Sequence, residues 1–277
     1  MKSFRSALRG VIERRAPLAA SLFRQLRDAI RYARLRPAKT NLGFAVVADR
    51  SIQNGSFEPA ETELIQSILL NGADRLIDVG ANIGYYTLLA RSLGKPAVAF
   101  EPLSSNLRLL LHNLEINGWN DVEVWPVGLG DSQKIVDIFG AATGASMVAG
   151  WAGGSVAYRQ RVPVTTLDTL LEGRFERERL LIKIDVEGAE YSVLRGAAKT
   201  IERLPRPVWL VEITNLHHPN GNRHFADTFE FFLGHGYSVR PAMRGSAVVS
   251  REQILQWSRD PAAEVPGYNW LFAAEDR

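Results

Sequence analysis

The side chains best suited to chemistry lie in the segment Lys183-Ile-Asp-Val-Glu-Gly-Ala-Glu190, which continues an apolar run. Three acids within six residues at the carboxyl end of a predicted strand favour function over packing. Asp185 and Glu187 are the main candidates to accept a substrate proton, a role that typically contributes about 10²–10⁴-fold in rate. For Glu190 the structural interpretation is stronger, because an acid in the first turn of a helix interacts favourably with the helix dipole.

A second polar group follows the next apolar run. Glu212 ends that run, and His217 and His218 lie just beyond it. Glu212 and His217 are second-line candidates for the base, although each histidine also suits an exposed loop. Asp185 or Glu187 is alternatively suited to hold a divalent cation that acidifies the reacting group. No spacing is diagnostic of a metal, so Mg²⁺ is only an alternative and no metal ligand is assigned.

The turn Asp78-Val-Gly-Ala-Asn-Ile-Gly-Tyr-Tyr86 predicts a nucleotide site. Its two glycines permit close backbone approaches, and the helix that follows offers unpaired N–H groups. The turn lacks the third glycine of the dinucleotide fingerprint G-x-G-x-x-G, and its aspartate suits a ligand ammonium better than a pyrophosphate. These differences favour S-adenosylmethionine over NAD. The candidate cofactor contacts in this turn are Asp78, Gly80, Ala81, Asn82, Gly84 and Tyr85.

Two further turns complete the predicted nucleotide site. Glu101, followed by Pro102, ends the second apolar run, where an acid commonly binds the ribose hydroxyls. The third run leads into a turn that contains Gly128 and Asp131, where the adenine is expected. Asp131 either accepts a hydrogen bond from the adenine amine or caps the turn. Asp185 is a further candidate cofactor contact, at the end of the fourth run.

For these turns to form one site, the strands that precede them must end at the same edge of a sheet. Apolar runs alternate with segments of helical spacing, which is typical of a doubly wound α/β fold with a mostly parallel sheet. The predicted helices span residues 85–93, 103–117, 188–202 and 225–234. The seven predicted strands span 75–79, 97–101, 122–126, 180–185, 208–214, 237–241 and 268–273. The last two are expected to pair antiparallel at an edge.

Two other segments are less regular. Residues 161–165 are strand-like, and the glycine-rich stretch 128–154 has no strong helical period. Along the fourth strand, two-residue alternation places Lys183 and Asp185 on the same face. Lys183 would otherwise be an unpaired charge in a buried strand.

Charge divides the 277-residue chain into an arm and a domain. Residues 1–40 carry eleven basic and two acidic residues, whereas the remainder carries 22 basic and 28 acidic ones. We therefore expect a basic amphipathic helical arm at 1–42 and a catalytic domain at 43–277. The arm is suited to pack on the domain, on a second subunit or on an anionic membrane surface. A transit peptide is a lesser alternative, and a secretory signal is not expected.

The composition also limits the function classes. Without cysteine, the chain has no disulfide, zinc–thiolate site or thiol nucleophile. No apolar run is long enough to span a bilayer. We expect a cytoplasmic location, with peripheral contact at the inner membrane surface as an alternative. Base methylation of nucleic acid is disfavoured, because the domain is acidic and no Asn-Pro-Pro-aromatic element follows the fourth strand.

Five segments in order and spacing resemble the FkbM family of methyltransferases. They are Asn54–Glu58, Asp78–Tyr86, Phe100–Pro102, Val164–Leu170 and Ile182–Glu190. The resemblance implies a class I methyltransferase fold and methyl transfer from S-adenosylmethionine to a hydroxyl of a sugar, a glycan or a polyketide-type natural product. The arm, the loop at 144–154 and the region after Asn215 lie outside it, and acceptor choice is expected there. A non-catalytic scaffold and a nicotinamide oxidoreductase are the competing interpretations.

Overall fold

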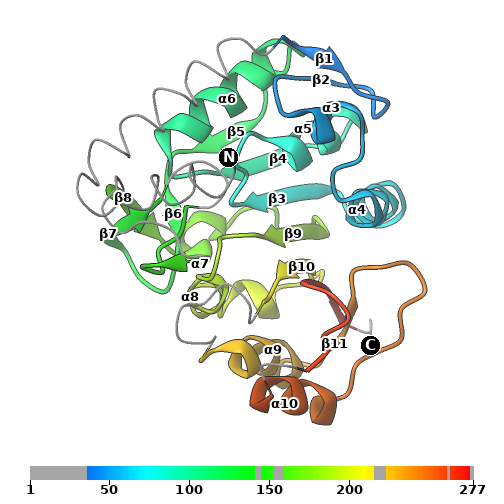
Figure 1. Ribbon diagram of the computed structural model, residues 1–277, viewed down its shortest axis with the longest axis vertical. Coiled ribbons are helices and arrows are strands. Elements are labelled where there is room, and N and C mark those ends of the chain that lie inside the picture. The colour runs from blue at the N-terminus through cyan, green and yellow to red at the C-terminus, as the bar shows by residue number, and fades with distance from the viewer. Residues whose placement is uncertain (1–35, 141–144, 152–158, 215–222, 261–262, 275–277) are drawn as a thin grey trace, which may run out of the picture.

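The computed structural model describes residues 36–140, 145–151, 159–214, 223–260 and 263–274, and its centre is a seven-stranded sheet (Figure 1). The strand order is β11–β12–β10–β9–β3–β4–β5. The strands are β3 (Arg75–Val79), β4 (Ala97–Phe100), β5 (Glu123–Trp125), β9 (Leu180–Ile184), β10 (Val208–Glu212), β11 (Tyr237–Pro241) and β12 (Asn269–Ala274).

The predicted α/β class and the mostly parallel sheet are confirmed. Strands β5, β4, β3, β9 and β10 are parallel, whereas β12 runs antiparallel to both β10 and β11. The predicted antiparallel pair therefore exists at this edge. The reversed strand lies one position inside the edge, and β11 is outermost.

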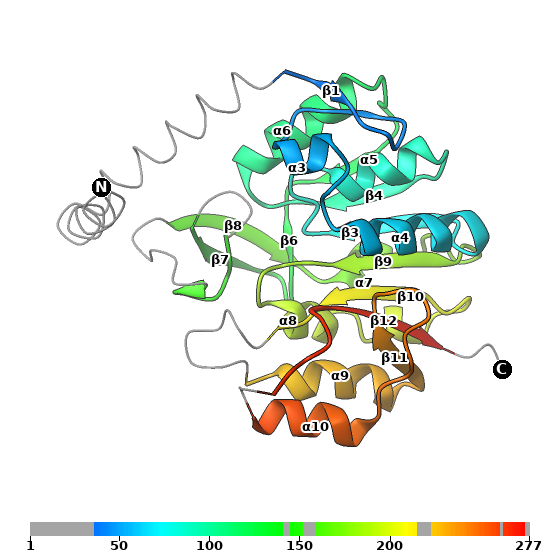
Figure 2. The same ribbon diagram turned by 45° about the vertical axis from the view of Figure 1, so that its right-hand side comes forward.

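Helices cover both faces of the sheet, which lies between them in Figure 2. One face carries α4 (Pro59–Asn71), α5 (Tyr85–Ser92) and α6 (Ser104–Glu115). The other carries α7 (Leu167–Leu171), α8 (Glu190–Arg195), α9 (Phe225–Gly234) and α10 (Arg251–Arg259). The sequence interpretation had named neither α4 nor α10.

Strand alternation divides the interior into two apolar cores. Leu181 packs in the core beneath α4 and α5, whereas Ile182 and Ile184 pack in the core on the opposite face. Because Lys183 and Asp185 continue the row of Leu181, they point toward α4 and α5, which confirms the predicted alternation.

A three-stranded sheet stands beside the main one, in the order β6 (Gly128–Leu129), β8 (Arg159–Thr165) and β7 (Lys134–Phe139). The strand-like segment at 161–165 is thus part of β8, but β7 had not been predicted within the glycine-rich stretch 128–154. Its sequence, Lys-Ile-Val-Asp-Ile-Phe, does carry the β-branched and aromatic residues of a strand, although it lacks two-residue alternation. The surrounding glycines obscured that signal.

The helix predicted at 188–202 is shorter than expected. It ends as α8 at Arg195, and a 3₁₀ turn, η3 (Thr200–Glu202), follows. Between them, Gly196 packs so closely against the backbone of Gly130 that a Cβ would overlap its carbonyl oxygen. The chain therefore turns where the smaller sheet meets the helix layer.

The start of the described chain is anchored on α6. The hairpin of β1 (Ala38–Lys39) and β2 (Ala45–Val46) straddles the predicted domain boundary at residue 43, and the short helix α3 (Arg50–Gln53) follows. Asn117, two residues after the end of α6, bonds both backbone groups of Ala45. The predicted helices of the arm lie in residues 1–35, outside the described residues. No helix among the described residues is long and apolar enough to cross a membrane.

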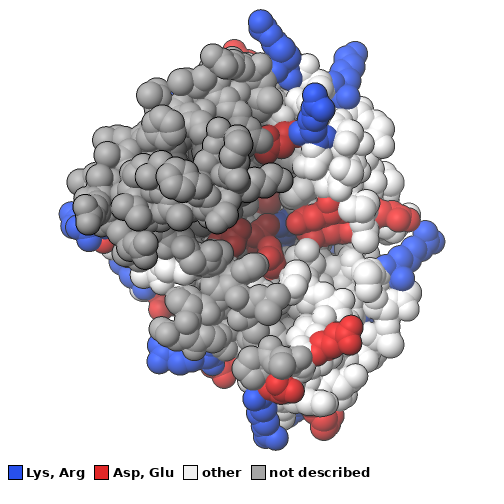
Figure 3. Space-filling view, in the orientation of Figure 1, with Lys and Arg blue, Asp and Glu red and all other residues white. Residues whose placement is uncertain are grey.

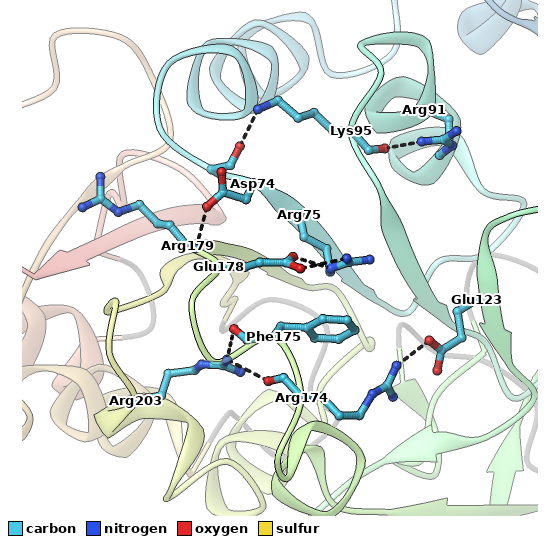
Figure 4. Close-up of polar contacts among 11 residues, drawn as sticks. Asp74, Arg75, Arg91, Lys95, Glu123, Arg174, Phe175, Glu178, Arg179 and Arg203 are labelled. Atoms are coloured by element: carbon cyan, nitrogen blue, oxygen red, sulfur yellow. Dashed lines mark hydrogen bonds and ion pairs between the residues drawn. The ribbon is translucent and has the colours of Figure 1, made fainter.

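A polar clamp closes the amino-terminal edge of the sheet, where β3 and β9 begin (Figure 4). Arg75 forms a bidentate ion pair with Glu178, with nitrogen–oxygen distances of 2.7 and 3.1 Å. The Arg75 guanidinium also lies 4.0 Å from the centre of the Phe175 ring. Arg203 donates hydrogen bonds to the carbonyls of Arg174 and Phe175. The loop that leads into β9 is thereby held against the start of β3.

Replacing the central guanidinium tests this clamp. Arg75→Met is expected to lower the free energy of unfolding by about 1–2 kcal/mol, because the bidentate pair and the ring contact are both lost. Urea denaturation measures this change. Arg159→Met is the matched control, since its pair with Asp137 is exposed and an effect below about 0.5 kcal/mol is expected. Equal losses in the two variants would contradict a clamping role.

Candidate active site

A cavity of about 410 Å³ opens at the carboxyl ends of the parallel strands. Figure 3 shows acidic side chains gathered around a hollow in the middle of this face, with basic side chains mostly at the periphery. Eight of the predicted site residues line the cavity: Gly80, Asn82, Glu101, Pro102, Gly128, Asp185, Glu187 and Glu212. The convergence of strand ends therefore brings together most of the predicted site.

The turn after β3 depends on its glycines. Gly80 has φ of +83°, and a Cβ there would overlap the carbonyl oxygen of Asp185. Gly84 has φ of +91°, and a Cβ would lie 2.8 Å from a side-chain carbon of Leu110. Both positions thus exclude a side chain, and Gly80 allows the ends of β3 and β9 to meet at the cavity.

Glu101 is fixed at the cavity by two backbone donors. The N–H of Asn82 donates to one carboxylate oxygen and the N–H of Leu103 to the other, each at 2.8 Å. Burial raises the pKa of Glu101 to about 7, although both hydrogen bonds oppose that rise. Asn82 also faces the cavity, and its buried side-chain oxygen has no hydrogen-bond partner among the described residues. It is an acceptor suited to a ligand donor.

The wall opposite the acids is apolar. Side chains from the β4 turn, the β5–β6 connection and the smaller sheet form it: Pro102, Leu103, Val127, Leu129, Ile138 and Met147. Leu103, Ile138 and Met147 also pack in one hydrophobic cluster. Such a wall suits a flat aromatic base.

Asp131 does not belong to this wall. Its carboxylate pairs with Lys134 at 2.5 Å and lies 4.0 Å from Arg195. Hydrogen bonds from Lys134 and Ser132 lower the pKa of Asp131. The described partners of the Asp131 carboxylate are all side chains, and its adenine contact stays a prediction.

Lys183 lies at the centre of a buried group of charges below the cavity, here called its floor, which also contains Asp185, Glu61 and Asp78. The side chain is only 2% exposed, and its ammonium lies 2.9 Å from Asp185 and 3.9 Å from Glu61. It also lies 4.7 Å from the centre of the Tyr86 ring. Burial alone would lower the pKa of Lys183, but the surrounding carboxylates, Asp185 first, raise it above its ordinary value. Lys183 is therefore a permanent cation in the protein interior.

Asp78 belongs to this floor and not to the cavity lining. It pairs in register with Lys183 on the neighbouring strand and is 1% exposed. Thr87 on α5 donates a hydrogen bond of 2.6 Å to its carboxylate. Burial raises the pKa of Asp78, and Lys183 opposes that rise. Asp78 is thus not among the residues that line the cavity, and its contact with the cofactor stays a prediction.

Asp185 and Glu212 form a carboxyl pair across neighbouring strands. Because Leu210 pairs with Lys183, Glu212 falls beside Asp185, and their side chains are hydrogen-bonded. Such a bond requires one of the two carboxyls to hold a proton. Burial and the charge of Asp185 raise the pKa of Glu212 to about 10. Burial also acts to raise the pKa of Asp185, but the charge of Lys183 and the hydrogen bonds from Lys183 and Glu212 together lower it. Glu212 is therefore the protonated member at neutral pH.

Glu187, like Glu101, is a lining acid whose pKa lies near neutral. It lines the cavity in the left-handed conformation, with φ of +53°. Burial, helped by the charge of Asp185, raises its pKa to about 7. The indole nitrogen of Trp151 donates to its carboxylate at 2.5 Å. Glu190 instead accepts from the N–H of Gly188 at 2.8 Å and begins α8, as the structural interpretation expects.

The remaining predicted residues lie elsewhere. Ala81, Gly84 and Tyr85 surround the β3 turn without lining the cavity. His217, the second-line base, falls in 215–222, outside the described residues, as does His218. Within the described ranges, no group of three acid or imidazole side chains is placed to hold a metal ion, so the magnesium alternative gains no support.

Three contributors had not been predicted: Glu61, Tyr86 as a partner of Lys183, and Trp151. Glu61 lies in the first turn of α4, and Tyr86 donates a 2.6 Å hydrogen bond to Glu58, just before that helix. The signal for α4 was present, since Pro59 is a typical first residue of a helix. No local pattern announces Trp151.

The family comparison agrees with this geometry. The model of the methyltransferase FkbM domain matches residues 78–239, more than half of the chain. The chain belongs to the FkbM methyltransferase family. This membership, together with the sheet order, confirms the predicted class I fold. A comparison with curated proteins finds no match.

Several solved methyltransferases are similar in fold. A precorrin-6y C5,15-methyltransferase from Geobacter metallireducens is 14% identical, with 84% of this chain and 93% of that chain covered at a TM-score of 0.45. An O-methyltransferase from Bacillus cereus in complex with SAH is 14% identical, with 96% of each covered at 0.44. TomG, an O-methyltransferase from Streptomyces achromogenes in complex with SAM, is 15% identical, with 79% and 80% covered at 0.44. At such values the assignment rests on the family match.

Removing the buried cation tests the floor of the site. Lys183→Met is expected to lower the free energy of unfolding by about 3–5 kcal/mol at pH 8, because Asp78 and Asp185 stay buried without their cation. Without Lys183 the folded-state pKa of Asp185 rises above its unfolded value and the raised pKa of Asp78 rises further, so stability is lost as pH rises and the penalty is smaller at pH 5. Urea denaturation at both pH values measures it.

The exposed Lys199 provides the matched control, since its pair with Glu172 lies on the surface. Lys199→Met is expected to change stability by less than about 0.5 kcal/mol at either pH. A pH-independent penalty in Lys183→Met would contradict the proposed charge balance.

Proposed function

We propose that this FkbM-family protein is an S-adenosylmethionine-dependent O-methyltransferase that acts on a hydroxyl of a sugar, a glycan or a natural product. The observation that carries the proposal is that Glu101 and Glu187 line the same cavity from different strand ends. We assign Glu101 as the ribose ligand and Glu187 as the proton acceptor.

The cavity suits the cofactor in three respects. Glu101, held by two backbone donors, retains acceptor capacity for two ribose hydroxyls. The unpartnered oxygen of Asn82 suits the ammonium of the amino-acid tail. The apolar wall around Leu103 and Ile138 suits the adenine. Bound S-adenosylmethionine supplies the methyl group.

Glu187 is better suited than Asp185 to accept the proton. The carboxylate of Asp185 is bound by Lys183 and by the proton of Glu212, which makes it a weak base. Glu187 has a pKa of about 7, close to the value at which a general base is most effective at neutral pH. The methyl group would pass to the acceptor oxygen as its bond to the cofactor's sulfur breaks, with the sulfur keeping the electron pair, and Glu187 would accept the hydroxyl proton.

The charge of the lining favours an uncharged acceptor. Six acids line the cavity, and the described lining residues include no lysine, arginine or histidine. An anionic acceptor such as a phosphorylated sugar or a nucleic acid would meet like charges without a compensating cation. A neutral hydroxyl compound meets no such penalty. A cytoplasmic location, and contact of the basic arm with a membrane or a second subunit, stay predictions from the sequence.

Binding measurements test the cofactor. By calorimetry, S-adenosylmethionine is expected to bind and NAD⁺ is not. Glu101→Gln is expected to weaken S-adenosylmethionine about tenfold or more, because the amide cannot accept from both ribose hydroxyls with full charge. Glu115→Gln, an exposed change at the end of α6, serves as control and should bind normally. Binding of NAD⁺, or of neither ligand, would refute the proposal.

Turnover measurements test the base. Labelled methyl transfer to a panel of neutral glycosides and lipid-linked sugars identifies an acceptor, and Glu187→Gln is then expected to lower kcat about 10²-fold or more with the cofactor still bound. Wild-type activity should rise with pH through about 7, as Glu187 loses its proton. Normal turnover by this variant would show that another group takes the proton.

A further inference from the structure

The segment 145–151 folds across the turn that follows β9. Trp151 is 4% exposed, although it lies in a connection between β7 and β8 and not in a core strand or helix. Its indole nitrogen donates to Oε2 of Glu187 at 2.5 Å. A large side chain is thus buried at the cavity with its single polar atom directed at the acid.

The ring of Trp151 is fixed by the backbone beneath it. A Cβ at Gly188 would overlap the six-membered part of the indole, with the nearest separations including 2.7 Å to Cε3. Gly188 also has φ of +94°. A glycine is therefore required at this position both by the backbone conformation and by the close approach of the indole. One edge of the six-membered ring therefore lies directly over the backbone of Gly188, and the indole N–H is directed at the carboxylate of Glu187.

A second tie joins the same two segments. The hydroxyl of Ser146, which is 1% exposed, donates to the backbone carbonyl of Glu187 and accepts from the N–H of Val148. Ser146 is itself paired with Phe139 at the end of β7. One segment thus holds both the backbone and the carboxylate of Glu187.

We propose that Trp151 is a positioning residue whose indole N–H directs the carboxylate of Glu187 toward the cavity and stabilises its ionised form. The step from this orientation to proton acceptance rests on the proposed function, but the orientation itself does not.

The surroundings of Glu187 make this donor important. Five charged or titratable groups face Glu187. They are Lys183 from β9, Asp185 from its own turn, Glu212 from β10, Glu190 from α8 and Glu58 from the residue before α4. All but Lys183 are carboxyls. Because Lys183 is already bound to Asp185, the indole N–H is the direct donor to the Glu187 side chain.

Nuclear magnetic resonance of the full-length protein without added ligand tests the contact. The indole ¹⁵N–¹H resonance of Trp151, assigned from triple-resonance spectra of the wild-type protein, is expected to shift with pH with a midpoint near 7, and Glu187→Gln should abolish that shift. Trp125 is an internal control, since its indole donates to Glu123 at 2.5 Å and hydrogen bonds lower the pKa of that acid despite its burial. Its resonance should titrate only at acidic pH.

The carboxyl carbon of Glu187 tests the effect. In protein labelled with ¹³C-glutamate, Trp151→Phe keeps a ring over Gly188 but removes the N–H. The titration midpoint of Glu187 is expected to rise by about one pH unit, since a hydrogen bond to the ionised form is lost. Trp125→Phe should leave that midpoint unchanged.

Three results would overturn the proposal: an indole resonance of Trp151 that does not titrate near neutral pH, a shift that persists in Glu187→Gln, or an unchanged Glu187 midpoint in Trp151→Phe. If Trp151→Phe fails to fold, the wild-type and Glu187→Gln titrations still decide the contact. Neither measurement uses S-adenosylmethionine or an acceptor, so failure of the methyltransferase proposal would be seen separately, in calorimetry and turnover.

Discussion

The burial of one ammonium group sets the conditions for the rest of the site. Lys183 lies in a central parallel strand, where an unpaired charge would be prohibitively costly. Its partners come from three directions: Asp185 two residues along the same strand, Asp78 in register on β3, and Glu61 from the first turn of α4. The requirement to neutralise one cation therefore binds two strands and a helix together directly below the cavity.

The charge of Lys183 also determines which of the neighbouring acids hold a proton. Asp185, in contact with Lys183, stays ionised, and Glu212, in contact with Asp185, keeps a proton. Glu187 is farther from the cation and has a pKa between these limits. A group that both takes up and releases a proton near neutral pH needs a pKa in this range. The buried charges below the cavity therefore set the protonation of the acid that lines it.

The sequence predicted those residues whose position follows from strand ends. Gly80, Glu101 and Asp185 each end a strand in a parallel sheet, and topology alone brings such positions together. Asp78 was interpreted as a cofactor contact, but two-residue alternation places it in the row of Lys183, below the lining. Trp151 depends on how an irregular loop crosses the turn at Gly188, which no periodicity records. The ion pair of Asp131 could have been predicted from the sequence, because Lys134 follows it by three residues.

The contact between Trp151 and Gly188 has an evolutionary consequence. A side chain at 188 would displace the indole, whereas a small side chain at 151 would leave a void over a glycine in a conformation that other residues avoid. Neither position can vary freely while the other stays as it is, so accepted changes should occur at both together. Trp151 and Gly188 would then change only as a pair. The rest of the connection from β7 to β8 could vary in sequence without moving the carboxylate of Glu187.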